Sequence, residues 1–346
     1  MLHYYITNRC NARCEFCLIW QEQPKIDAAL GDVVSNLRQA REAGCKFADF
    51  TGGEPLLHPK LPEFLAAAKK LGFVTSVTTN CLLFSERAGE LAGLVDLLHF
   101  SIDADSAELH DKIRGGESYN RVINSIDAAL ANKLYPDLMF TYTEENINAI
   151  EGVWKLAREK RLILILDPVF ATSGGEDKVS RNAHRQALDF SKKKGVYLNR
   201  AHLLLRDMGG NRVRDPLCRA VSSTVVITPD NRLALPCYHH RCVNVGINGD
   251  LAGVLRSRER EEALSKEGRY SFCEGCHINC YFDPTYQFAG GRFWRESVRS
   301  KLRYAVTKYL LYRRPWPIWG FKKPTSLGMP ITIDEYGSTP TAGKRS

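Results

Sequence analysis

The first 195 residues alternate between segments with the pattern of a buried strand and segments with the pattern of an amphipathic helix. Strands are expected at residues 2–6, 46–50, 73–78, 97–101, 138–142 and 162–166, and helices at residues 30–43, 61–71, 85–94, 122–129, 147–160 and 183–195. Strands separated by helices pair in parallel through right-handed crossovers. Six such units, rather than eight, predict an α/β fold built as a partly open (β/α)6 barrel. Chemistry in such a barrel lies at the C-terminal ends of the strands.

Three cysteines, Cys10, Cys14 and Cys17, lie within eight residues directly after the first expected strand. A structural zinc site takes four ligands, usually as two separated pairs, whereas the next cysteine in this chain is Cys45. Cubane iron–sulfur clusters also take four thiolates, so a loop with three leaves one iron without a protein ligand. Because that iron can bind a small molecule, the spacing predicts a reactive iron–sulfur site. A zinc site and plain reduced thiols are the alternatives.

A second motif, Thr51-Gly-Gly-Glu-Pro55, follows the next expected strand. Glycines at 52 and 53 let a ligand approach the backbone closely, and Pro55 stiffens the exit. The C-x3-C-x2-C loop, with Phe16 before its third cysteine, and the Gly-Gly-Glu-Pro turn together resemble the signatures of the radical S-adenosylmethionine (SAM) enzymes. They also occur in that family's order. The resemblance covers roughly residues 1–200 and continues in a cysteine-rich region to about residue 285.

The resemblance implies that Cys10, Cys14 and Cys17 hold a [4Fe-4S] cluster to which SAM binds, with electrons from a donor such as flavodoxin or ferredoxin. Reductive cleavage of SAM then gives a 5′-deoxyadenosyl radical that abstracts hydrogen from the substrate. The turn comprising Gly52, Gly53, Glu54 and Pro55 is implied to bind the methionine part of SAM. Ser101 and Asp103, at the end of the fourth expected strand, are implied to bind its ribose. A capped helix start is the alternative for this pair, because both residue types favour that position.

Four later cysteines supply the thiolates that complete a second cubane: Cys218, Cys237, Cys273 and Cys276. Two flank an expected hairpin (strands 224–228 and 233–235), and two form a C-x2-C pair. This arrangement resembles the auxiliary-cluster module called the twitch domain, a shortened SPASM domain, and implies a second, auxiliary [4Fe-4S] cluster. Structural zinc is the alternative, and Cys242 and Cys280 stay unassigned as replacement ligands.

The hairpin departs from the family pattern, since relatives usually carry a glycine where this chain has Asn231-Arg232. Asparagine tolerates the left-handed backbone conformation that such a turn requires, so we expect the turn to form.

The chain is therefore expected to comprise three regions. A radical SAM partial barrel covers residues 1–205, a twitch/SPASM-like iron–sulfur domain covers 206–290, and a basic aromatic tail covers 291–346. A polar linker is expected at 207–216. In the tail, a helix over about 294–314 precedes an extended end, and residues 298, 302, 305, 306, 309 and 310 form its apolar face. This helix either packs on the barrel with its basic side in water or lies on an anionic membrane surface.

Composition and charge narrow the location and the partners that we expect for the chain. Its 44% hydrophobic and 25% charged residues are ordinary for a soluble globular protein. No signal peptide pattern precedes the first strand, so the eleven cysteines indicate metal or redox chemistry in the cytoplasm rather than disulfides. A formal net charge of +9 suits nucleic acid or an anionic membrane. Because the chain carries no recognised nucleic-acid module, we expect no nucleic-acid partner. We expect a cytoplasmic location, with peripheral contact at the inner face of the membrane as the alternative.

Further candidates lie near the expected strand ends. Asp167, at the end of the sixth strand, is the candidate catalytic residue as a proton acceptor, with a surface ion pair as the alternative. The segment His110–Gly116 also resembles the family, and we expect its polar residues to face solvent. Cys45 and Cys81 are expected to be small buried residues, with substrate contact as an alternative for Cys81.

The combined interpretation is a radical SAM enzyme that modifies a peptide or small metabolite. Its auxiliary cluster would take up an electron from the substrate radical or orient the substrate. Radical SAM chemistry on a lipid or lipid-linked substrate at a membrane is the alternative. A non-enzymatic iron–sulfur or zinc-binding protein would leave the Gly-Gly-Glu-Pro turn, in register with the three-cysteine loop, unexplained.

Overall fold

The computed structural model describes residues 1–170 and 179–317. Within these residues, ten strands form a single sheet in the order β10-β9-β8-β1-β2-β3-β4-β5-β6-β7. The strands are β1 Leu2–Thr7, β2 Phe47–Gly52, β3 Val74–Thr79, β4 Leu97–Ser101, β5 Asp137–Tyr142, β6 Leu164–Pro168, β7 Val196–Tyr197, β8 Val225–Ile227, β9 Arg232–Pro236 and β10 Arg241–Gly246.

The helices alternate with β1–β7 and then follow one another around the cysteine-rich region. The α-helices are α1 Leu30–Glu42, α2 Leu61–Lys70, α3 Phe84–Leu91, α4 Ala107–Arg114, α5 Tyr119–Ala131, α6 Ile150–Glu159, α7 Arg181–Phe190, α8 Arg200–Asp207, α9 Ala220–Ser223, α10 Leu251–Val254, α11 Arg258–Ser265, α12 Asn279–Thr285 and α13 Gly291–Ala305. Shorter elements are the 3₁₀ turns η1 Ile19–Gln21, η2 Pro55–Leu57, η3 Ile147–Ala149 and η4 Ser271–Cys273, and the π-helical turn η5 Val306–Leu311.

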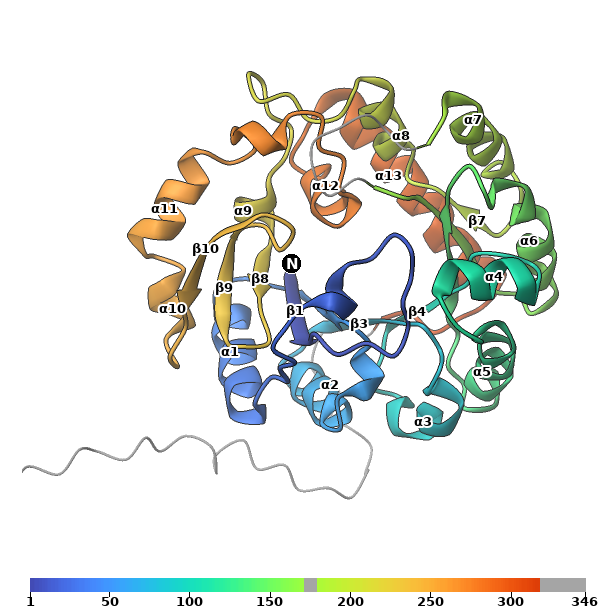
Figure 1. Cartoon of the computed structure of the whole chain (residues 1–346), viewed down its shortest axis with the longest axis horizontal. Helices are drawn as coiled ribbons and strands as arrows, with labels where there is room; N and C mark the ends of the chain where they lie inside the picture. The colour runs from blue at the N-terminus through green and yellow to red at the C-terminus, as the bar shows by residue number, and fades with distance from the viewer. Residues whose placement is uncertain (171–178, 318–346) are drawn as a thin grey trace, which may run out of the picture.

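Strands β1 to β7 are parallel and neighbour one another in chain order, as strand–helix units require. Helices α1, α2, α3, α5, α6 and α7 follow one another along the outer side of the curved sheet (Figure 1). The α/β partial barrel expected from the sequence is therefore confirmed. The structure adds a short seventh parallel strand, β7, because the helix expected to reach residue 195 ends at Phe190.

Strands β1 and β3 are buried almost throughout, whereas buried and partly exposed residues alternate along β2, β4 and β6. Phe50, Phe100 and Phe140, on β2, β4 and β5, are fully buried in one continuous hydrophobic core. One face of these strands therefore forms the core, and the candidate site residues lie in the loops at the strand ends.

The cysteine-rich region continues the same sheet. Strand β8 pairs in parallel with β1, with Leu2 opposite Val225, and β9 and β10 follow as antiparallel strands. The predicted hairpin is present as β8 and β9, and Asn231 at its turn has a φ of 58°. Asn231 therefore adopts the left-handed conformation that was expected for this turn.

The polar segment expected to be a linker contains a buried anchor. Asn211 is 1% exposed, and its side-chain amide donates to the carbonyl oxygens of Gly268 (2.8 Å) and Cys273 (3.1 Å). Its side-chain oxygen accepts hydrogen bonds from the backbone N–H groups of Leu217 and Cys218. This segment therefore fixes the position of the second cysteine group.

In the tail, α13 and η5 together span residues 291–311, close to the expected helix, and the expected extended end lies mostly outside the described residues. The helix packs beside α8 and β7 (Figure 1). Of the expected apolar face, Tyr309 is buried, whereas Leu302, Val306 and Leu310 are exposed. The other buried side chains of this segment are mostly polar: Ser297, Ser300, Thr307 and Lys308. No helix in residues 1–170 and 179–317 has both the length and the apolar character needed to cross a bilayer.

Candidate cofactor sites

The three-cysteine loop leaves β1 and is closed at its base by polar side chains. Asn8 donates from its side chain to the carbonyl oxygen of Pro24 (2.8 Å) and accepts from the backbone N–H of Ile26 (2.7 Å). The hydroxyl of Thr7 donates to Asp27 (2.6 Å). These bonds hold both ends of the loop together, so the cysteines between them are presented as one unit at the C-terminal end of the sheet.

The turn after β2 lies directly against the start of this loop. The backbone N–H groups of Gly53 and Glu54 donate to the carbonyl oxygens of Thr7 and Arg9, each over 2.8 Å. A Cβ atom at Gly52 would lie 2.0 Å from the Thr7 carbonyl oxygen, and one at Gly53 would lie 2.0 Å from that of Arg9. A side chain at either position would therefore clash with the start of the cysteine loop. Both glycines are needed for this close contact between two backbone segments, whether or not a ligand also approaches them.

Glu54 is buried and connects this turn to the end of β3. One carboxylate oxygen accepts from the Thr79 hydroxyl (2.8 Å), and the other accepts from the backbone N–H of Asn80 (2.8 Å). Burial raises the pKa of Glu54, and the hydrogen bonds from Asn80, Leu56 and Thr79 lower it. The carboxylate is thus held in one orientation at the mouth of the barrel.

Asn80 extends this network to the first cysteine. Its side-chain amide lies 3.9 Å from Cys10 Sγ and donates to the side-chain oxygen of Asn11 (2.8 Å). The Gly-Gly-Glu-Pro turn, the end of β3 and Cys10 therefore form one hydrogen-bonded unit.

A separate network from β4 and α4 reaches the second cysteine. Arg114 is 8% exposed, and its Nη1 atom lies 3.6 Å from Cys14 Sγ, while Nη2 lies 2.5 Å from Asp103 Oδ2. Burial alone would lower the pKa of Arg114, but the charges of Asp103 and Cys14 raise it, so the guanidinium stays protonated. The expectation that the polar residues of 110–116 face solvent is wrong for Arg114 and for His110, which is fully buried.

Helix α4 docks on the cysteine loop through its backbone as well. The N–H groups of Arg13 and Glu15 donate to the carbonyl oxygens of Arg114 and Ile113, each over 3.1 Å. Gly115 follows with a φ of 72°, and a Cβ atom there would lie 2.6 Å from the Arg13 carbonyl oxygen. The Arg114-Gly115 pair thus clamps the loop between Cys10 and Cys17.

Ser101 and Asp103 lie where the sequence placed them, at the end of β4, and both are buried. Asp103 also accepts from the backbone N–H of Thr141 (2.9 Å) in addition to pairing with Arg114. Its carboxylate is therefore engaged by protein groups on two sides, a role that sequence reasoning did not assign to it.

The three loop thiols suit a thiolate-ligated cluster. Burial raises the pKa of Cys10 to about 11 and also raises that of Cys17, and each pKa is raised further by charge on the neighbouring loop cysteines. Three thiols that repel one another when ionised, beside a buried guanidinium, form a donor set that a cationic iron cluster would stabilise. Cys10, Cys14 and Cys17 are thus the residues of this site that could hold such a cluster.

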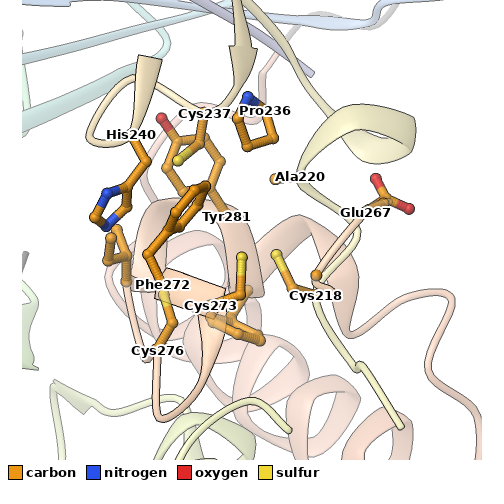
Figure 2. A pocket seen from close by; sticks show the side chains of 13 residues that line it. Cys218, Ala220, Pro236, Cys237, His240, Glu267, Phe272, Cys273, Cys276 and Tyr281 are labelled. Atoms are coloured by element: carbon orange, nitrogen blue, oxygen red, sulfur yellow. The ribbon is translucent and has the colours of Figure 1, made fainter. Parts of the chain in front are cut away.

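The four later cysteines surround a single pocket. Cys218 precedes α9, Cys237 follows β9, and Cys273 and Cys276 flank the turn after η4 (Figure 2). The empty space between the lining atoms is ≈ 400 Å³, including its opening to solvent. Most other lining residues are apolar or aromatic, among them Pro236, Phe272, Ile278, Tyr281 and Phe282.

The electrostatics of this pocket resemble those of the first site. Burial raises the pKa of Cys237 to about 12 and that of Cys273 to about 11, and Cys276 raises both further. Within the described ranges, no three His, Cys, Asp or Glu side chains meet as ligands of a single metal ion would. The four thiols line one pocket and come from separate segments of the cysteine-rich region (Figure 2).

The two unassigned cysteines lie outside this pocket. Cys242 is exposed on β10. Cys280, on α12, is turned toward the barrel, where burial first and Asp167 second raise the pKa of its thiol. His240, three residues after Cys237, lines the pocket, and its ring stacks on that of Phe272 with centroids 4.3 Å apart.

Asp167 lies between the barrel and the cysteine-rich region. It ends β6 and accepts a hydrogen bond from the side-chain amide of Asn279 on α12 (2.9 Å). Burial raises its pKa to about 6, while Arg206 and Asn279 lower it. The sequence identified Asp167 from its strand-end position, but the contact from Asn279, 112 residues away, carries no signal in a single sequence.

Tyr238 connects the two cysteine groups. It follows Cys237, and its ring stacks on that of Tyr5 in β1 with centroids 3.5 Å apart. Its hydroxyl donates to Glu22 (3.0 Å), which lies just beyond the three-cysteine loop. Sequence reasoning missed Tyr238, Asn80 and Arg114, because each acquires its position through contacts that are distant in the chain.

Comparison with solved structures shows the same fold. Streptococcus suis SuiB bound to the precursor peptide SuiA has a TM-score of 0.63 and 16% sequence identity, over 81% of this chain and 75% of that chain. The structure of native anSMEcpe with bound AdoMet has a TM-score of 0.60 and 15% identity, over 88% and 98% of the two chains.

Sequence comparison gives curated relatives named GTP 3′,8-cyclase. The protein from Clostridium acetobutylicum is 31% identical over 159 residues, which are 43% of this chain and 49% of that protein. A probable GTP 3′,8-cyclase from Saccharolobus solfataricus is 34% identical over 139 residues, 39% and 45% of the two chains. The chain thus spans about half the length of these relatives. The protein from Chlorobaculum tepidum matches at 27% identity over 75% of this chain and 83% of its own length.

The family comparison covers the part of the barrel that carries the first site. Residues 4–157 match the Radical SAM superfamily model, and this range contains the three-cysteine loop, the Gly-Gly-Glu-Pro turn and the Arg114–Asp103 pair. Members of this family use a [4Fe-4S] cluster together with SAM. This part of the chain, 154 of its 346 residues, is therefore similar to the radical SAM superfamily.

Proposed function

We propose that this chain is a radical SAM enzyme with two iron–sulfur sites, one for SAM cleavage and one auxiliary. The observation that carries the proposal is the separation of seven cysteines into a loop of three at the end of β1 and a pocket lined by four. Three thiolates leave a coordination position open, whereas four close the cluster. The set of three therefore suits a reactive cluster, and the set of four suits an electron-transfer or structural cluster.

At the first site, Cys10, Cys14 and Cys17 would hold the cluster. When bound and reduced by an external donor such as flavodoxin or ferredoxin, the cluster would supply the electron for SAM cleavage. The turn at Gly52–Pro55, with Glu54 fixed by Thr79 and Asn80, would receive the methionine end of SAM. Ser101 and Asp103 would lie near the ribose, with Arg114 holding Asp103 in place. Because these groups are already fixed by internal hydrogen bonds, binding would require little rearrangement.

At the second site, Cys218, Cys237, Cys273 and Cys276 would hold the auxiliary cluster in a mainly apolar pocket. We propose a cluster because the spacing of these four cysteines resembles that of auxiliary-cluster modules, and structural zinc, which also takes four thiolates, is the alternative. Tyr238, stacked on Tyr5 and bonded to Glu22, would keep the two sites in a fixed relation.

The region between the sites would be the place of substrate chemistry. Asp167, with a pKa raised to about 6, lies at the strand ends that face the auxiliary region and is our candidate proton acceptor. A carboxylate that titrates near the working pH is suited to take a proton from a substrate radical as that radical is oxidised.

For the substrate, we propose a peptide or a small metabolite. The similarity in fold to a structure solved with a precursor peptide favours the peptide, with this chain covering 75% of that protein. A nucleotide is the second candidate, because the relative named GTP 3′,8-cyclase from Chlorobaculum tepidum matches over 75% of this chain. A lipid-linked substrate and a non-enzymatic carrier are the remaining alternatives.

The test is anaerobic incubation of the reconstituted protein with SAM and a reductant, with mass-spectrometric detection of 5′-deoxyadenosine. Parallel reactions would contain GTP, peptides encoded near the gene, or no substrate. We expect 5′-deoxyadenosine in every reaction, and a substrate-dependent increase with one class. Absence of 5′-deoxyadenosine from protein with full iron content would overturn the enzymatic proposal. An increase with GTP alone would replace the peptide with the nucleotide.

A further inference from the structure

The helix α13 and the following turn η5 expose an unusual share of the large apolar side chains of the described chain. Of the eleven exposed large hydrophobic residues, seven lie between residues 288 and 316. They are Phe288, Trp294, Leu302, Val306, Leu310, Leu311 and Trp316, with exposed fractions from 43% to 64%. We call this set the apolar stripe. Isolated exposed hydrophobic residues need no explanation, but a concentration in one continuous segment, here α13, η5 and the residues on either side of them, marks a site of interaction.

The orientation of the helix is fixed by its polar side. Lys308 is 4% exposed and donates to Asp137 at the start of β5 (2.7 Å) and to the hydroxyl of Tyr304 (2.8 Å). The Ser300 hydroxyl accepts from the backbone N–H of Arg200 (3.2 Å). A rotation that buried the apolar stripe would pull Lys308 away from the buried carboxylate of Asp137, which is strongly unfavourable. The outward direction of the stripe is therefore a property of the fold.

Basic residues accompany the stripe. Residues 291–317 contain eight Lys or Arg residues and a single acidic residue, Glu296, in a chain whose formal net charge is +9. Arg292, Arg295, Arg299, Arg303 and Arg313 are exposed. Among these, Arg299 pairs with Glu296 (3.2 Å), and Arg303 donates to the carbonyl oxygens of Lys192 and Lys193. Most of the net positive charge of the chain thus lies beside its apolar stripe.

We propose that the outward face of α13 and η5 is a docking surface for an anionic lipid bilayer, bound in the plane of the interface. Leucine, valine and tryptophan side chains would enter the boundary between headgroups and acyl chains, and the arginines would pair with lipid phosphates. Trp294 and Trp316 suit the interface, because an indole ring combines an apolar body with a polar N–H group. The inference does not depend on the chemistry proposed above.

The other candidate occupants fit the charge pattern less well. A second copy of the chain would bring two like-charged helices together, which repel. A nucleic acid would match the arginines but would leave Leu302, Val306 and Leu310 without an apolar partner. The remainder of the chain, residues 318–346, has four basic and two acidic residues, so its charge does not complement the surface either.

The test measures binding of the full-length, cluster-loaded chain to vesicles. One set contains phosphatidylcholine alone, and the other contains about 30 mol% phosphatidylglycerol, an anionic lipid of the kind that attracts basic segments. We expect at least tenfold tighter binding to the anionic vesicles at low salt, and weaker binding at high salt because exposed charges are screened.

Three variants separate the contributions. The variant Leu302→Ser/Val306→Ser/Leu310→Ser removes exposed apolar groups, and Arg292→Gln/Arg295→Gln/Arg299→Gln removes exposed charge. Each is expected to weaken binding at least tenfold while leaving the far-ultraviolet circular dichroism unchanged. The matched control, Met208→Ser/Leu264→Ser, removes exposed apolar groups elsewhere and should bind like the wild type.

Several outcomes would overturn the proposal. Failure of the folded wild type to bind anionic vesicles at low salt would do so, as would equal binding by the apolar-stripe variant. A dimer in solution that this variant abolishes would assign the surface to a second copy. Tight duplex DNA binding insensitive to the apolar variant would assign it to nucleic acid. Vesicle binding by a chain ending at Pro317 but not by the full chain would assign the surface to residues 318–346.

Discussion

The Nη1 atom of Arg114 lies 3.6 Å from the Sγ atom of Cys14, with both residues buried at the mouth of the barrel. The same guanidinium forms an ion pair with Asp103 at the end of β4. A fixed positive charge therefore stands beside a thiol that is expected to hold the first cluster. Because each added electron makes a cluster more negative, this charge should favour the reduced state.

Replacement of Arg114 by glutamine should make the reduction potential of the first cluster more negative. One charge at roughly 6 Å is worth about 3 kcal/mol at an effective dielectric constant of about 20, and Asp103 cancels part of it, so a shift of about 50–100 mV is expected. Redox titration followed by electron paramagnetic resonance measures the shift. Arg114→Gln/Asp103→Asn is the control, since it also removes the unpaired carboxylate. Unchanged potentials in both folded variants would show that Arg114 serves only to hold α4 on the loop.

At the hairpin turn, Asn231 combines a φ of 58° with a hydrogen bond to its side-chain oxygen from the side chain of Asn36 (2.8 Å). Asn231→Ala should lower the free energy of unfolding by about 2 kcal/mol, because it loses the hydrogen bond and adds backbone strain. Asn231→Gly should lose only about 1 kcal/mol, because glycine adopts this conformation without strain. Denaturant unfolding of the two variants distinguishes them, and equal losses would mean that the backbone conformation contributes nothing.

The raised pKa of Asp167 makes stability depend on pH in a defined direction. Burial raises this pKa from 3.8 to about 6, so between these values the folded chain holds a proton that the unfolded chain has lost. The stabilising contribution of the group therefore falls as the pH rises through this window. Relative to Asp167→Asn, the wild type should lose about 1 kcal/mol of unfolding free energy between pH 5 and pH 7. A difference between the two proteins that is constant across this range would contradict the shift.

Lys308 and Asp137 form a buried ion pair that fixes the terminal helix on the barrel. Lys308→Met takes the ammonium group away from the buried Asp137 carboxylate, which keeps the hydrogen bond from the Tyr304 hydroxyl (2.6 Å). The loss of this charge partner should cost about 3 kcal/mol of stability or release the helix. Adding Asp137→Asn should recover much of this loss, because an amide is less costly to bury than a charge. Thermal unfolding reports stability, and limited proteolysis of residues 291–317 reports release. Full stability and protease resistance of Lys308→Met would show that the pair does not anchor the helix.

The barrel could be predicted because its signals are local. The six strand–helix units follow from hydrophobic periodicity, and the thiol loop and the Gly-Gly turn are contiguous motifs at strand ends. The left-handed turn at Asn231 also follows from a single residue type. Strand β7, with only two residues, is too short to leave a pattern.

The parts that could not be predicted depend on long-range pairing of polar groups. From the sequence alone, Arg114 is expected to face solvent. In the structure it is buried because it contacts Asp103 and Cys14. Periodicity gives the terminal helix an apolar face but does not decide whether the barrel or another surface covers it. The buried Asp137 binds Lys308, and this ion pair turns that face outward. A single sequence does not record such partners, since they are separated by up to 171 residues.

The most direct test of the central claim compares iron content and SAM cleavage in variants of the two cysteine groups. Anaerobically reconstituted wild type should hold about eight irons, and Cys10→Ala/Cys14→Ala/Cys17→Ala should hold about four and form no 5′-deoxyadenosine. Cys218→Ala/Cys276→Ala, if its circular dichroism is unchanged, should still form 5′-deoxyadenosine but no product. Full iron content together with 5′-deoxyadenosine formation in the triple variant would contradict the assignment of the reactive cluster to the loop after β1.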